Sequence, residues 1–222
     1  MKNTKQESFS HIIWDWNGTL LNDTWLCVDI VNGLLKVRNL PEVSLDRYLD
    51  IFDFPVKEYY SKLGFDFTAE SYSQLAAVFI AEYERRRLEC TLHAGVTKTL
   101  RRLKECGYRQ MVLSAYAQDA LVSILSHFGL SGYFDAVYGL DNFYAAGKES
   151  LGRTLIAREN IAPSSALMIG DTTHDYAVAR SIGVPCALVA TGHQSRRRLE
   201  QCGVVVHDTL EEIGAGLQEW VA

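Results

Sequence analysis

Three carboxylates, one ammonium and one hydroxyl in this chain have the spacing of a site that could transfer a phosphoryl group. Asp15, Ser114 and Asp171 each follow a short, largely apolar run, Lys148 begins a helical pattern, and Asp175 comes one helical turn after Asp171. Carboxylate oxygens bind a hard dication such as Mg²⁺. The ammonium and the dication would neutralise a phosphoryl group that the carboxylates alone would repel.

Asp15 is the most informative of these residues. It ends the run Ile-Ile-Trp at residues 12–14 and begins the hexapeptide Asp-Trp-Asn-Gly-Thr-Leu. A carboxylate at the end of a strand, followed by Asn17 and Gly18, is an exposed acid on a tight turn. That position suits a nucleophile or a metal ligand, although the same hexapeptide could form an ordinary Asx turn. The polar residues that follow in order favour the functional interpretation.

The elements that must position these residues alternate from about residue 94 onward. Uninterrupted apolar strands between helices indicate a parallel sheet that is covered on both faces, so we predict an α/β fold with a Rossmann-like core. All strands of such a sheet end at one edge, where the polar residues can converge. Strands are expected over 12–14, 108–114, 136–138, 166–169, 186–189 and 204–206. Helices are expected over 95–106, 118–128, 149–159, 178–182 and 194–202, and a last helix follows the strand 204–206 and runs to about Trp220.

Residues 24–91 break this alternation. Their patterns are helical, with no credible strand, and Pro41 stops the first helix, which begins at Thr24. We therefore predict two domains: an α/β core made of residues 1–23 and 92–222, and a helical cap made of residues 24–91. A cap inserted after the first strand would sit over the edge of the sheet where open parallel sheets bind ligands.

Composition restricts the partners of the protein. The 222 residues are 48% hydrophobic and carry a net charge of −5, which favours neither nucleic acid nor an anionic membrane as a partner. The five cysteines include no Cys-x-x-Cys pair, which is typical of reduced thiols. No segment approaches 18 uninterrupted apolar residues. We expect a cytoplasmic protein, and the sequence leaves its oligomeric state open.

The motifs resemble those of the haloacid dehalogenase superfamily, in order. The likeness rests on the hexapeptide from Asp15, on Ser114 after an apolar strand, on Lys148, and on the stretch Gly-Asp-Thr-Thr-His-Asp that ends at Asp175. It extends to the stretch from Gly192 to Gly203, which is similar to the phosphoglycolate phosphatase branch. That branch also has a helical cap after its first motif.

The resemblance implies a Mg²⁺-dependent hydrolase of a small phosphorylated metabolite. Asp15 would be the nucleophile that becomes an aspartyl-phosphate. The implied catalytic residues are Asp15, Asn17, Ser114 and Lys148. The implied metal ligands are Asp15, the Asn17 backbone carbonyl, Asp171 and Asp175. The implied phosphate-binding residues are Gly18, Thr19, Ser114, Ala115 and Lys148, with Thr19 supporting the loop.

Asn17 departs from the pattern of the superfamily. Its phosphatases usually carry an aspartate there, which protonates the leaving oxygen and then deprotonates the attacking water. General acid–base catalysis of this kind contributes about 10²–10⁴-fold, and an amide cannot supply it. Three interpretations follow. In the first, the protein is a phosphatase in which His174, His93 or Asp119 substitutes for the missing acid, or in which the substrate has a good leaving group.

The two other interpretations change the activity. One is a relative of phosphonoacetaldehyde hydrolase, which also lacks the second aspartate and activates its substrate through a cap lysine. Lys57 and Lys62 lie in the right region of the insert, although the residues around them match that enzyme poorly. The other is a very slow or non-catalytic protein that binds a phosphorylated ligand.

Overall fold

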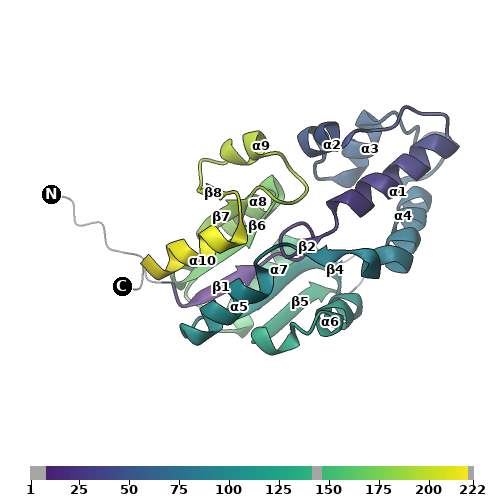
Figure 1. Cartoon of the computed structure of the whole chain (residues 1–222). Coiled ribbons are helices and arrows are strands. Elements are labelled where there is room, and N and C mark those ends of the chain that lie inside the picture. The colour runs from purple at the N-terminus through teal and green to yellow at the C-terminus, as the bar shows by residue number, and fades with distance from the viewer. Residues whose placement is uncertain (1–8, 142–146, 220–222) are drawn as a thin grey trace.

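A six-stranded parallel sheet forms the centre of the protein in a computed structural model that describes residues 9–141 and 147–219. Each neighbouring pair of strands is parallel, and β1 lies in the middle (Figure 1). In spatial order the strands are β5 (Ala136–Leu140), β4 (Arg109–Ala117), β1 (His11–Trp14), β6 (Ala166–Gly170), β7 (Cys186–Val189) and β8 (Val206–His207).

The register of the central strands brings their carboxyl ends together. Trp14 of β1 is level with Val112 of β4 and with Ile169 of β6. The residues that follow these three positions therefore meet at one edge of the sheet, which is where parallel sheets bind ligands. Asp15 and Asp171 come from this edge.

Helices cover both faces of the sheet, as the uninterrupted apolar strands predict. Ile13 packs in a cluster with Leu155 of α7 (Lys148–Arg158) and Val178 of α8 (Thr173–Ile182). Trp14 points to the other face and packs in the cluster that contains Leu100 of α5 (Val96–Glu105). Each fully buried aliphatic side chain of this kind contributes about 1.5–3 kcal/mol. One face carries α7 (Lys148–Arg158) and α8 (Thr173–Ile182); the other carries α5 (Val96–Glu105), α6 (Gln118–His127) and α10 (Leu210–Glu219).

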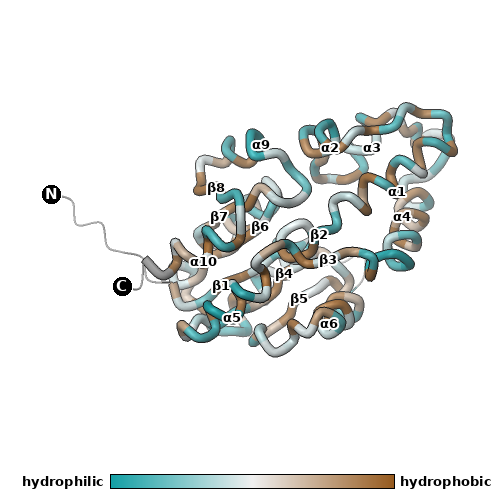
Figure 2. The backbone as a smooth tube through the Cα atoms, in the orientation of Figure 1, coloured by the Kyte–Doolittle hydropathy of each residue, from teal (hydrophilic) through white to brown (hydrophobic). Residues whose placement is uncertain are grey.

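Four helices follow the short strand β2 (Leu21–Asn22) and precede β3 (Thr91–Leu92), which pairs with it in an antiparallel ladder. Figure 1 shows these helices grouped beyond one end of the sheet, and Figure 2 shows hydrophobic residues along α1 and α4. Ser71 begins α4 with a capping box, which satisfies backbone donors of the first turn. The helices are α1 (Thr24–Val37), α2 (Leu45–Ile51), α3 (Val56–Lys62) and α4 (Tyr72–Arg86).

The predicted α/β fold is confirmed, and the structure corrects several details. Strand β4 continues past Ser114 to Ala117 with a register irregularity, and the β2–β3 pair was not expected from sequence. The remaining elements are α9 (Arg196–Glu200) and the 3₁₀ turns η1 (Arg87–Glu89), η2 (Ser131–Tyr133) and η3 (Pro163–Ser165). Trp220, the predicted end of the last helix, lies outside the described residues, and the division into core and cap domains stays a prediction.

Among residues 9–141 and 147–219, none of the helices combines the length and the apolar character that a membrane span requires.

Candidate active site

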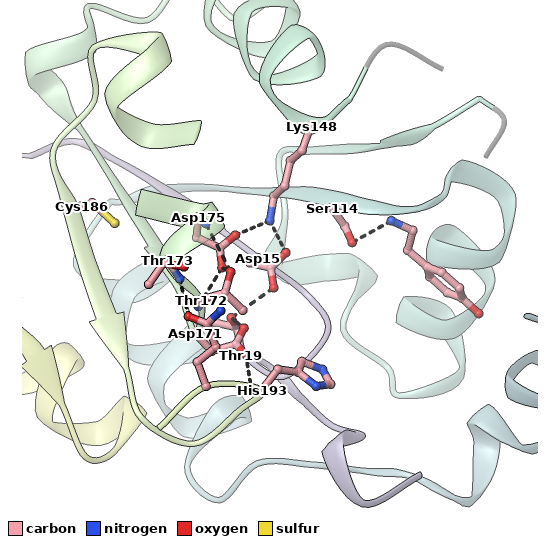
Figure 3. Close-up of polar contacts among 12 residues, drawn as sticks. Asp15, Thr19, Ser114, Lys148, Asp171, Thr172, Thr173, Asp175, Cys186 and His193 are labelled. Carbon is pink, nitrogen blue, oxygen red and sulfur yellow. Dashed lines mark hydrogen bonds and ion pairs between the residues drawn. The ribbon is translucent and has the colours of Figure 1, made fainter. Parts of the chain in front are cut away.

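Lys148 lies between two buried carboxylates at the edge of the sheet. Its ammonium pairs with Asp15 Oδ1 and, at 2.5 Å, with Asp175 Oδ1 (Figure 3). Asp15 follows β1, Lys148 is the first residue of α7, and Asp175 lies in the first turn of α8. Three residues that are far apart in the chain therefore meet because the sheet is parallel, as the sequence predicts.

Asp171 joins the same cluster from the end of β6. Its Oδ1 accepts a hydrogen bond from the Thr19 hydroxyl at 2.8 Å, and its Oδ2 accepts one from the His193 backbone N–H at 2.7 Å. The Thr19 hydroxyl also lies 3.2 Å from Asp15 Oδ2. Gly18 has φ +74°, and a Cβ there would come within 2.3 Å of Asp171 Oδ2, so the turn requires glycine.

The three carboxylates suit a hard dication. One oxygen from each of Asp15, Asp171 and Asp175 lies within 4.8 Å of the others, and all three residues are buried. Burial raises the pKa of Asp15 and of Asp171, and the neighbouring carboxylates raise it further. A bound Mg²⁺ would offset this repulsion with the oxygen ligands that it prefers. The donor set therefore fits the predicted metal.

The ion pair between Lys148 and Asp175 raises the pKa of Lys148 and lowers the pKa of Asp175. Although burial disfavours the ammonium, the charges of Asp15 and Asp175 raise the pKa of Lys148. Burial likewise opposes ionisation of Asp175, but Lys148 and the Thr172 hydroxyl, which donates to Asp175 Oδ2 at 2.6 Å, lower its pKa. Lys148 is therefore a fixed positive charge at the site.

A cavity of about 300 Å³ opens beside this cluster, large enough for a small ligand. Of the predicted phosphate-binding residues, Ser114, Ala115 and Lys148 line it. Gly18 and Thr19 are not among its lining residues. The N–H of Gly18 lies within hydrogen-bond distance of Asp23 Oδ1 (2.8 Å) and of the Leu21 carbonyl (3.0 Å). The Ser114 hydroxyl accepts a bond from the Tyr116 N–H at 3.1 Å.

The Asn17 side chain belongs to a buried network that sequence reasoning missed. Its Nδ2 lies 2.8 Å from Asp23 Oδ2 and 2.7 Å from the Tyr83 hydroxyl, which itself donates to Asp23. His193 Nε2 lies 3.3 Å from Asp23 Oδ1. Burial alone would lower the pKa of His193, but the Asp23 carboxylate raises it to about 9. Burial alone would raise the pKa of Asp23, but His193 lowers it. The signal available was the polar pair Asn22-Asp23, which one residue, Leu21, separates from the hexapeptide.

Comparison with known proteins agrees with this geometry. A family model described as "Haloacid dehalogenase-like hydrolase" matches residues 12–189. The chain belongs to this family. The predicted resemblance of the motifs is therefore confirmed.

The relatives of this haloacid dehalogenase-like chain include two phosphoglycolate phosphatases. That of Caulobacter vibrioides is 29% identical over 210 residues, which cover 90% of this chain and 87% of the relative. That of Rhodobacter capsulatus is 25% identical over 187 residues, covering 82% and 85%. A crystal structure of a predicted phosphatase from Clostridium acetobutylicum superposes with a TM-score of 0.76 at 25% identity, covering 95% of this chain and 99% of that one.

The structure separates the candidates for the missing acid of this family member. His174 lines the cavity, where it stacks on Phe54 with ring centroids 4.5 Å apart, and burial lowers its pKa. Neither His93 nor Asp119 is among the lining residues, and Asp119 is exposed on α6. His174 is therefore the best placed of the three.

The candidate Schiff-base lysines lie elsewhere. Lys57 and Lys62 are exposed on α3 and do not line the cavity, and the Lys57 ammonium instead lies 5.5 Å from the centroid of the Phe67 ring. This placement gives no support to the phosphonoacetaldehyde hydrolase interpretation.

Replacing Lys148 by Met should destabilise the metal-free protein by about 3 kcal/mol, because it leaves two buried carboxylates without their cation. The Lys148 side chain is 3% exposed. Lys98→Met is the matched control, since that side chain is 74% exposed and pairs with Glu211 at the surface, so it should cost well under about 1 kcal/mol. Urea unfolding at pH 7 without divalent cations measures both. Equal losses would contradict the assignment of Lys148 as the central charge.

Proposed function

We propose that this chain is a Mg²⁺-dependent phosphatase that hydrolyses a small phosphorylated metabolite through an aspartyl-phosphate on Asp15. The observation that carries the proposal is the buried cluster in which Lys148 joins Asp15 to Asp175, with Asp171 beside them. The phosphatase names of the relatives support the same reaction class. We propose that it acts in the cytoplasm.

The side chains at the cavity have complementary tasks. A carboxylate oxygen of Asp15 attacks phosphorus, so that the Asp15–phosphorus bond forms as the ester oxygen leaves. Lys148 and Ser114 hold the phosphoryl oxygens as negative charge develops on them. Mg²⁺, held by Asp15, Asp171, Asp175 and the Asn17 carbonyl, would supply further charge neutralisation. Water then cleaves the acyl phosphate, which restores Asp15 and releases inorganic phosphate.

Proton transfer is the weak step of this reaction. The Asn17 amide already lies within hydrogen-bond distance of Asp23 and Tyr83 and has no proton to give to the leaving oxygen. The leaving group therefore departs as an anion that takes its proton from water, which favours esters of acidic alcohols. The interpretation as a slow, phosphate-binding protein rests on this same residue, and it remains the second candidate.

The helices α1–α4 act as a cap in this proposal. They contribute Tyr48, Tyr59 and Phe79 to the cavity that also contains Asp15, so a bound substrate would lie between the two parts. Closing such a cavity excludes water from the reaction and assigns specificity to the helices.

Removal of divalent cations tests the proposal. Treatment with EDTA should lower phosphate release from acetyl phosphate by at least about 10²-fold, because the carboxylates would again repel the phosphoryl group, and added Mg²⁺ should restore it. Inorganic phosphate is measured by a colorimetric assay. A rate that is unchanged by EDTA would contradict the metal assignment. Tight binding of phosphate ligands by calorimetry without any turnover would favour the second candidate.

A further inference from the structure

The wall of the cavity beyond the carboxylates is aromatic. Eight aromatic residues from Tyr48 to Tyr83 line it, and we call them the aromatic chamber. They pack on one another: Phe52 lies 5.0 Å from Tyr48 and 5.2 Å from Tyr59 between ring centroids, and Phe79 stacks on Tyr83 at 6.2 Å. The members of the aromatic chamber are Tyr48, Phe52, Phe54, Tyr59, Tyr60, Tyr72, Phe79 and Tyr83.

The carboxylates in this wall are already paired, whereas the buried Tyr59 hydroxyl has no hydrogen-bond partner. Asp23 accepts bonds from Asn17 and Tyr83 and lies beside His193. Glu84 accepts a bond from the Tyr116 hydroxyl and lies 3.3 Å from Arg87. A ligand therefore meets ring faces and edges here rather than unpaired charges, and such surfaces favour apolar and aromatic groups.

Among the described lining residues, no lysine or arginine is free of a carboxylate and able to pair with a second anionic group. The basic lining residues are Lys148, which pairs with two carboxylates, His193, which faces Asp23, and His174, whose ring stacks on Phe54. A ligand carboxylate in the aromatic chamber would be desolvated with no cation to pair with, because the unpaired Tyr59 hydroxyl is a neutral donor, and this is costly. The chamber therefore disfavours phosphoglycolate, the substrate that the relatives' names give.

The volume of the cavity is sufficient for one aromatic ring beside a phosphoryl group. An apolar cavity of about 150 Å³ accepts benzene, so a cavity of about 300 Å³ holds one aromatic ring and a phosphoryl group. Resting on the proposed phosphatase function, we infer that the substrate is a phosphate monoester of an aromatic alcohol or phenol, with its ring in the aromatic chamber and its phosphoryl group at Asp15 and Lys148.

Two matched esters test this inference. Benzyl phosphate and phosphoglycolate are both phosphates of primary alcohols and differ in carrying a phenyl ring or a carboxylate on the same methylene carbon. We expect kcat/KM for benzyl phosphate to exceed that for phosphoglycolate by about 10²-fold, because the carboxylate would lose its hydration without gaining a cationic partner. Acetyl phosphate, which needs no chamber, reports the phosphoryl site independently.

The outcomes separate the two proposals. No turnover of all three compounds overturns the phosphatase function. Turnover of acetyl phosphate with equal or better use of phosphoglycolate than of benzyl phosphate overturns the aromatic substrate alone. A binding arm needs no turnover: with Mg²⁺ present, calorimetry should show benzylphosphonate binding about 10²-fold more tightly than phosphonoacetate, and the reverse order overturns the inference.

A positive charge placed in the aromatic chamber should reverse the preference for benzyl phosphate over phosphoglycolate. Phe79→Arg adds a cation to the wall, so kcat/KM should fall about 10-fold for benzyl phosphate and rise about 10-fold for phosphoglycolate. Val78→Arg is the control, because Val78 is on the same helix, 50% exposed and absent from the lining. If Phe79→Arg does not fold, Phe79→Leu should lower kcat/KM for benzyl phosphate about 5-fold, whereas Val78→Leu, outside the lining, should leave the rates with benzyl phosphate and acetyl phosphate unchanged. An identical profile for the variants at positions 78 and 79 overturns the inference.

Discussion

Asp15→Asn should abolish turnover while leaving the protein folded. The change removes the attacking oxygen and one metal ligand, and removal of a covalent nucleophile costs about 10⁴–10⁶-fold in kcat. The structure predicts no matching loss of stability. Burial and the charges of Asp175 and Asp171 already disfavour the Asp15 carboxylate, and Lys148 retains its ion pair with Asp175.

Steady-state release of phosphate from acetyl phosphate measures this effect, with urea unfolding as the check on folding. Asp119→Asn is the control, since it makes the same chemical change on an exposed turn of α6 outside the cavity lining. Mass spectrometry of acid-quenched enzyme should detect a phosphoryl adduct on the wild type and none on the variant. A variant that retains more than a hundredth of the wild-type rate would show that Asp15 is not the nucleophile.

The positions of the catalytic candidates could be predicted because parallel strands impose them. Asp15 and Asp171 follow β1 and β6, which are neighbours in register, so their convergence follows once the sheet is inferred. Lys148 and Asp175 lie in the first turns of α7 and α8, which pack on the same face. The alternation of strands and helices in the sequence is therefore sufficient to predict which residues of this cluster converge.

The rest of the site depends on contacts that no spacing in the sequence reveals. His193 comes from the loop after β7, and Tyr83 reaches Asp23 from α4, across 60 positions of chain. The positions of His193 and Tyr83 relative to Asp23 depend on how α1–α4 pack against the carboxyl edge of the sheet. The aromatic chamber escaped prediction for the same reason, because its members lie in several helices and in the α2–α3 loop and meet only once these elements are placed.

Asn17→Asp should raise turnover of esters with poor leaving groups. The new carboxyl would lie where the Asn17 amide now lies, 2.8 Å from Asp23 Oδ2. Two buried carboxyl groups at that distance cannot both ionise readily, so the pair holds a proton that can be given to the leaving oxygen. We expect hydrolysis of benzyl phosphate to increase by about 10²–10⁴-fold. 4-Nitrophenyl phosphate should gain far less, since its leaving group departs without a proton.

Benzyl phosphate needs a proton on its leaving oxygen and 4-nitrophenyl phosphate does not. Comparing their rates therefore distinguishes proton transfer from a change in the electrostatic field at the site. Asn22→Asp is the matched control, because it adds the same charge five residues away, outside the cavity lining. The double change Asn17→Asp with Asp23→Asn removes the second carboxyl that keeps the pair protonated, so it should lose most of the gain if the shared proton causes it. Equal gains on both esters would indicate a field effect. No gain on either would show that another group, of which His174 is the best placed, already transfers the proton.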